Sequence, residues 1–269
     1  MCHKVIRPAL WRDIEMNARQ QQGFGLVELM VGLLISLLIS MAAYAVFKGS
    51  AMAARRVIDT EATWHDAELS LLNMTQNISN AGYMMNLTAV GAPNPVQTAN
   101  SVAWVDPNIS NPSQTLTVYS NINTTANPVT AEILSANIWD IAINPATGNP
   151  ALRLTVGAAA PVYYADGVLA MRFRFSCTSA PGSYQTICPG GITDAKSVQV
   201  AMLVRGINMD PNAQQTGTPV SAASYTFPDG TVYNVPALNL CGGADCQAYR
   251  HQLFVTEVPL RNINWANNL

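Results

Sequence analysis

An uninterrupted apolar run near the N-terminus constrains this chain more than any other feature. It covers residues 23–47 and reads GFGLVELMVGLLISLLISMAAYAVF. The run contains no Lys, Arg, Asp or His and a single acid, Glu28. At ~1.5 Å per residue a helix of this length spans about 35 Å, enough to cross the ~30 Å hydrocarbon core of a bilayer. Residues 24–47 are therefore predicted to form a transmembrane helix.

Glu28 distinguishes this run from a plain membrane anchor. A charged side chain at the centre of a bilayer costs about 2.5–3.5 kcal/mol on insertion scales, so an acid inside an apolar run indicates a functional site. Directly before the run stands a polar, basic segment that ends in glycine, Arg19-Gln20-Gln21-Gln22-Gly23.

This combination of a basic leader, a glycine, an acid at the fifth place after it and an apolar helix resembles the type IV prepilin signature. The resemblance implies that a prepilin peptidase removes residues 1–23 by cutting between Gly23 and Phe24. It also implies that Phe24 becomes the N-methylated terminus, and that Glu28 serves assembly. Pairing the buried carboxylate with an α-amino group would satisfy both charges when helices are staggered by about one turn.

The alternative for the apolar run is an ordinary secretory signal, which would be removed after small residues such as Ala43 and Ala45. Such signals have an apolar core of about 7–15 residues, which is shorter than this run and would not contain Glu28. The sequence therefore favours the prepilin interpretation. Met16 offers a second start that gives the compact leader MNARQQQG, and we expect translation to begin there.

The composition suits an exported protein that is rich in strands and loops. The chain has 269 residues, 49% of them apolar, which is enough for one large or two small domains, while only 11% are charged. Without the predicted leader it keeps ten basic and fourteen acidic residues, so its net charge is −4. Because there is no basic excess to neutralise phosphates, we expect no direct nucleic-acid binding.

Four of the five cysteines lie outside the predicted leader, in two close pairs: Cys177 with Cys188, and Cys241 with Cys246. Glycines in both short loops permit tight turns, and an even number of cysteines in an exported chain favours disulfide bonds within each pair. A zinc site is the alternative, but it would prefer two to four residues between the members of both pairs. We expect no metal and no cofactor.

Residues 48–82 are predicted to continue the helix as its amphipathic half, so that one helix of about 55 residues ends at Gly82. Apolar residues recur there every three or four positions, namely Val57, Thr60, Trp64, Ala67, Leu71, Met74, Ile78 and Ala81. The opposite, polar face carries Asp66, Ser70, Asn73, Asn77 and Asn80. Half of the helix would lie in the membrane and half on a sheet.

Residues 83–269 are predicted to form a β-rich periplasmic or extracellular head. Residues 84–150 are interpreted as a loop-heavy connection with short strands. After residue 150 the apolar period changes to two. Two strands are predicted with these inward residues: Leu169, Met171, Phe173 and Phe175 in the first, and Val198, Val200, Met202 and Val204 in the second. Arg172 and Arg174 on the opposite face are interpreted as solvated, with an anion site as the alternative.

The helix ending Asn-Ala-Gly-Tyr at 80–83, the arginine-bearing strand and the terminal Pro-Leu-Arg-Asn at 259–262 resemble PilW-type minor pilins. The resemblance implies the α+β fold of type IV pilins, in which a long N-terminal helix packs on an antiparallel β-sheet head. Sequence motifs for nucleotide, metal or hydrolase chemistry are absent, so we expect no enzyme and no catalytic residue.

The resemblance further implies a minor pilin of an assembly-initiation or tip complex that supports pilus biogenesis and twitching motility. Its partners would be other minor and major pilins, the prepilin peptidase, the inner-membrane assembly platform and membrane lipid. It would first lie in the bacterial inner membrane as a single-pass protein with a periplasmic head, and then in the pilus at the cell surface. The alternatives are a type II secretion pseudopilin, which a neighbourhood of secretion genes would favour, and a membrane-anchored ligand-binding domain, which saturable binding would favour.

Overall fold

The computed structural model describes residues 25–83, 85, 93–101, 103, 106, 108–122, 133–191, 194–210, 213, 219–236 and 246–266. Gly23, Phe24 and Cys241 lie outside this part of the chain. The chain divides into two compact units, Met1–Ala51 and Met52–Leu269.

The long N-terminal helix is confirmed as α1 (Leu26–Ser79), a helix of 54 residues. It ends where the sequence predicts, because Gly82 adopts a φ of +73°, a left-handed conformation that glycine adopts without strain. The Gly82 N–H donates to the Tyr119 carbonyl oxygen at 2.9 Å, which fixes the chain as it leaves the helix.

The first unit holds the N-terminal part of α1. Among the described residues, α1 is the one helix whose length and composition would allow it to cross a membrane. None of its apolar window is buried in the structure. The span over residues 24–47 stays a prediction.

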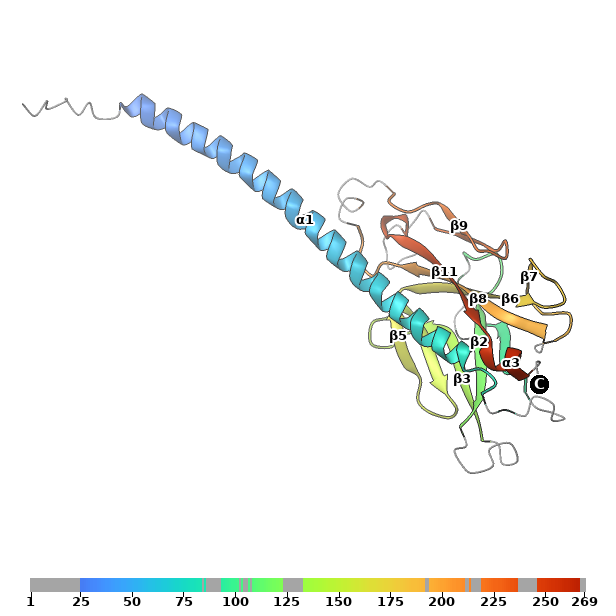
Figure 1. Ribbon diagram of the computed structural model, residues 1–269. Coiled ribbons are helices and arrows are strands. Elements are labelled where there is room, and N and C mark those ends of the chain that lie inside the picture. Colours follow the sequence, from blue (N-terminus) through green and yellow to red (C-terminus); the bar gives the residue numbers. More distant parts are fainter. Residues whose placement is uncertain are drawn as a thin grey trace, which may run out of the picture. The chain divides into compact units, whose positions relative to one another are not determined.

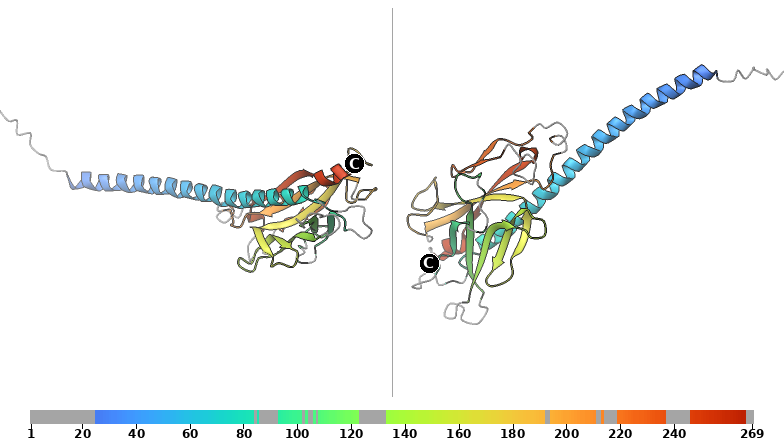
Figure 2. Two further views of the ribbon diagram at one scale, coloured as in Figure 1. Left: turned by 60° about the horizontal axis from the view of Figure 1, so that its bottom comes forward. Right: turned by 180° about the vertical axis from the view of Figure 1, so that it is seen from behind.

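Two antiparallel sheets dominate the second unit (Figures 1 and 2). The first has the order β1-β2-β3-β4-β5, and its strands are β1 (Val96–Asn100), β2 (Gln114–Asn121), β3 (Leu134–Ile143), β4 (Pro150–Val156) and β5 (Val162–Asp166). The short strands expected within residues 84–150 are confirmed: the described residues of this segment supply β1, β2 and β3. The extent of these strands is hard to read from the sequence, because polar residues such as Gln114 and Asn121 are buried in β2.

The second sheet has the order β11-β8-β6-β7. Its strands are β6 (Val168–Cys177), β7 (Tyr184–Gln185), β8 (Ala195–Arg205) and β11 (His251–Pro259). A small hairpin pairs β9 (Ser224–Thr226) with β10 (Val232–Asn234), and two short helices, η2 (Cys246–Ala248) and α3 (Arg261–Ala266), flank β11 in the sequence.

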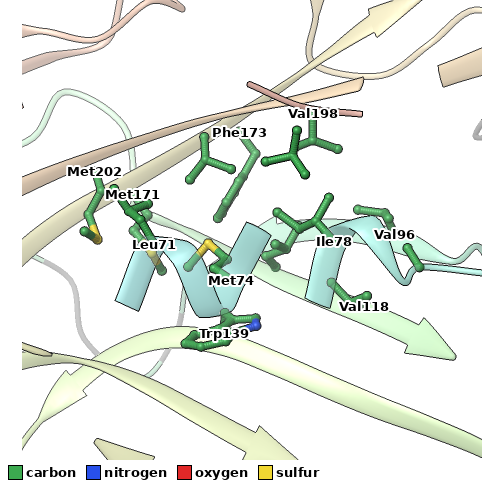
Figure 3. Close-up of a cluster of buried hydrophobic side chains, with 14 of the residues drawn as sticks. Leu71, Met74, Ile78, Val96, Val118, Trp139, Met171, Phe173, Val198 and Met202 are labelled. Atoms are coloured by element: carbon green, nitrogen blue, oxygen red, sulfur yellow. The ribbon is translucent and has the colours of Figure 1, made fainter. Parts of the chain in front are cut away.

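The C-terminal half of α1 and both sheets share one hydrophobic core. In Figure 3, Met74 of α1 lies between Trp139 of β3 and Phe173 of β6, all fully buried. The predicted inward residues of β8 belong to this core, as do Met171, Phe173 and Phe175 of β6. The fold is therefore the predicted combination of a long apolar helix and an antiparallel β-sheet head.

Three predicted orientations are wrong. Val57, expected on the apolar face of α1 that packs on the sheet, is 53% exposed. Leu169 belongs to a second cluster with its neighbour Ala170, because a bulge between Val168 and Ala170 interrupts the alternation of β6. Ser70, placed on the polar face of α1, is buried, and its hydroxyl donates to the Asp66 carbonyl oxygen at 2.6 Å. A serine whose hydroxyl bonds to its own helix can be buried at little cost.

Candidate assembly surface

Glu28 lies in the first turn of α1, which begins at Leu26. The first N–H groups of a helix have no partner within the helix, and together with the helix dipole they favour a negative charge. The helical hydrogen bonds start at once, since the Leu29 N–H donates to the Gly25 carbonyl oxygen at 3.1 Å. The carboxylate is thus held on a helical turn that suits its charge, close to the predicted new N-terminus.

An exposed apolar surface surrounds Glu28 on α1. The large apolar residues of 26–47 all have exposed side chains in the structure. The Ser36 hydroxyl donates to the Leu33 carbonyl oxygen at 2.9 Å, which satisfies this polar group within the helix. The part of α1 before Lys48 is therefore an apolar surface with one acid.

Gly23 and Phe24, the predicted cleavage and methylation residues, lie outside the described residues. The structure therefore places Glu28 and leaves its predicted partner, the Phe24 amine, as a prediction. The sequence separation of four residues corresponds to about one helical turn.

A disulfide bond joins Cys177 and Cys188, the first pair expected from the sequence. Both cysteines are buried, and because their sulfur atoms are bonded to each other they are not thiolate ligands for a zinc ion. Beside the bond, the Asp194 carboxylate accepts hydrogen bonds from the hydroxyl and the N–H of Ser179 and from the Gly190 N–H, and these lower the pKa of Asp194. Cys246 is also disulfide-bonded; its predicted pairing with Cys241 stays a prediction.

The arginines of β6 are neither a solvated face nor an anion site, because both bind the protein itself. The Arg172 Nε donates to the Asp229 carboxylate at 2.6 Å, and its Nη1 donates to the Pro112 carbonyl oxygen at 2.7 Å. Arg174 donates to the carbonyl oxygens of Pro228 and Tyr184, and its guanidinium lies 5.5 Å from the Tyr184 ring centroid. The turn between β9 and β10 thus covers this face. No local sequence signal indicates a partner 57 residues away.

Residues 18–44 match the family described as "Prokaryotic N-terminal methylation motif". The chain carries the N-terminal signal of a type IV pilin-like protein. The match contains the predicted cleavage site, the predicted methylated residue and Glu28. Pilins are structural proteins, so this pilin-like chain is not an enzyme. The motif implies processing by a prepilin peptidase and interaction with other pilins, and together with the apolar helix it fits membrane anchoring and a place in a pilus.

No curated protein matches the chain. Among solved structures, the chain is similar to a type IV-like pilin from Thermus thermophilus, with a TM-score of 0.40 and 14% sequence identity. The similarity covers 74% of this chain and 96% of that chain.

Proposed function

We propose that the chain is a minor type IV pilin of the PilW type that takes part in an assembly-initiation or tip complex. The observation that carries the proposal is Glu28, a single acid in the first turn of an exposed apolar helix, inside the residues that match the methylation motif. The minor role and the PilW type rest on the resemblance of the helix ending, the arginine-bearing strand and the terminal Pro-Leu-Arg-Asn.

Before assembly, the mature chain lies in the inner membrane through its first helical half, with the head in the periplasm. The peptidase releases the Phe24 amine, and the assembly platform then transfers the helix from lipid into a bundle of pilin helices. In that bundle a lone carboxylate would cost several kcal/mol. The Phe24 amine of its own or of a neighbouring chain neutralises it, since no Lys or Arg occurs before Lys48 in the mature sequence.

The pairing also sets the axial position of the subunit. Apolar helices can slide along one another, whereas one buried ion pair selects one stagger. The acid therefore specifies register, and an apolar replacement would insert into the membrane equally well but assemble poorly.

The test is complementation of a deletion strain with Glu28→Ala and Glu28→Asp variants. Glu28→Ala should leave leader cleavage, membrane insertion and head folding intact while reducing recovery of the subunit in sheared fibres and the number of pili. Glu28→Asp, whose carboxylate is retracted by one methylene, should show a partial defect. Ser36→Ala serves as the matched control, because it removes a polar side chain of the same apolar run whose hydrogen bond is local to the helix. Wild-type piliation with Glu28→Ala would contradict the proposed role.

A further inference from the structure

Outside the core, α1 carries a second apolar row that faces solvent. Ile58, Leu69 and Leu72 are 66%, 46% and 55% exposed, whereas Ala67, Leu71, Met74 and Ile78 of the same helix are buried. We call the second row the exposed stripe; it consists of the apolar residues Ile58, Ala62, Leu69 and Leu72 and of the exposed His65 between them. Its steps of four and three residues are the spacing at which one helix packs against another in a coiled coil.

The exposed stripe continues onto the sheet. At its C-terminal end a groove of about 320 Å³ is lined by Leu72 and Thr75 of α1 and by Phe254 and Val255 of β11. β11 is an edge strand of its sheet, and Val255 is 48% exposed. A helix seated on the stripe would therefore also find room for one side chain beside Val255.

Acidic residues border the exposed stripe on both sides. Glu61 and Glu68 each come directly before a residue of the stripe, and Asp66 comes directly after one. These are the flanking positions at which coiled coils form interhelical ion pairs. All three are exposed, and among the described residues their carboxylates have no ion pair or hydrogen bond. The helix thus presents an apolar seam between unpaired negative charges.

This charge pattern argues against a second copy of the chain as the occupant. A copy packed in register would place acids opposite acids, which is destabilising. A copy shifted along the axis would offer Arg55, but Arg55 lies three residues before Ile58 and therefore on the stripe itself. Its cation would enter the apolar seam instead of meeting the acids at the edges.

We propose that the exposed stripe binds an α-helix of a different chain, with apolar residues at coiled-coil spacing and Lys or Arg at the flanking positions. The inference rests on the proposed function, because that partner is then another subunit of the same assembly. The stripe would select the neighbour of this subunit, whereas Glu28 sets the axial stagger.

The test uses the full-length protein in nanodiscs of phosphatidylcholine, a lipid without net charge that does not attract basic peptides. The probes are two labelled synthetic helices of 21 residues with the same apolar seam, one with Lys and one with Glu at every flanking position. Fluorescence anisotropy at low salt should show about tenfold or more tighter binding of the Lys helix, lost at high salt. The triple charge reversal Glu61→Lys, Asp66→Lys and Glu68→Lys should invert the preference.

The apolar contribution is tested with Leu69→Gln and Leu72→Gln together, which should abolish binding of both helices. Ile187→Gln is the matched control, because Ile187 is 78% exposed and lies outside the stripe. Equal binding of the two helices, binding that survives the double Leu→Gln change, or efficient Ala62→Cys cross-links between copies in membranes would overturn the inference. Since peptide binding needs no pilus, its failure beside normal Glu28-dependent fibre incorporation would leave the proposed function standing.

Discussion

The side-chain amide of Asn262, just after β11, donates hydrogen bonds to the carbonyl oxygens of Ser79 and Ala81 at the end of α1, each at 3.3 Å. The last carbonyl groups of a helix have no partner within the helix. The terminal Pro-Leu-Arg-Asn segment therefore caps a helix more than 180 residues earlier in the chain. Leu260 and Ile263 on either side of Asn262 are fully buried, so the cap is held by the core.

Asn262→Asp should destabilise the head more than Asn262→Ala. Both variants remove the donor, but the carboxylate would also face carbonyl oxygens and the negative end of the helix dipole. We expect a loss of about 1 kcal/mol for alanine and about 2 kcal/mol for aspartate in urea unfolding. Equal stability of the two variants would mean that the amide does not cap α1.

Removing the arginine from the Arg172–Asp229 ion pair should destabilise the protein more than removing it from the more exposed Arg153–Asp140 pair. The side chains of Arg172 and Asp229 are both 11% exposed, whereas Arg153, which binds Asp140, is 24% exposed. Arg172→Ala leaves a nearly buried carboxylate without its cation and should cost about 3 kcal/mol. Arg153→Ala is the control and should cost less. The Arg172→Ala, Asp229→Ala double variant should recover part of the loss, and strict additivity would contradict a coupled pair.

Replacing Cys177 and Cys188 together by serine should lower the free energy of unfolding by about 2–3 kcal/mol, because the closed loop is short. Non-reducing peptide mapping of the wild type should recover these two cysteines in one bridge. Unfolding of the double variant under reducing conditions provides the control, because any further loss of stability there comes from the bond of Cys246. A bridge from Cys177 to Cys241 or Cys246 would refute the pairing.

Stability should fall below neutral pH through His251. Burial lowers the pKa of His251 to about 4. The hydrogen bond to the Tyr249 carbonyl oxygen raises the pKa, but by less than burial lowers it. Because the folded state binds the proton less tightly, the stabilisation is complete above pH ~6.5 and is lost progressively toward pH 4. Between pH 7.5 and 5 this residue should account for about 2 kcal/mol. His251→Gln should remove that share of the pH dependence, and an unchanged slope would contradict a half-buried, neutral histidine.

Local features of the chain could be predicted from the sequence. The repeat of three and four residues predicted the buried face of α1 from Ala67 onward, Gly82 marked the end of the helix, and the alternation in β8 predicted its inward face. Glu28 could be recognised as a candidate functional residue from the local sequence alone, because it is a single acid in an apolar run.

Features that depend on contacts between distant segments could not be predicted from the sequence. The bulge at Leu169 changes which face its side chain occupies, without a sequence signal. Gln114 of β2 is buried because the other sheet supplies its partner: the Gln114 side chain accepts from the Phe173 N–H at 2.6 Å. The Arg172 pair and the Asn262 cap likewise join residues far apart in sequence. The exposed stripe became visible only once the structure separated it from the buried face.

The most direct test of the account is the mass of the mature N-terminal peptide from membrane-extracted protein. The mature chain should begin at Phe24 with an N-methyl group, since the methylation motif covers residues 18–44. Gly23→Arg, which spoils the cleavage position, should give a chain that keeps its leader. A mature chain that begins after Ala45, without the apolar helix and without Glu28, would contradict the account.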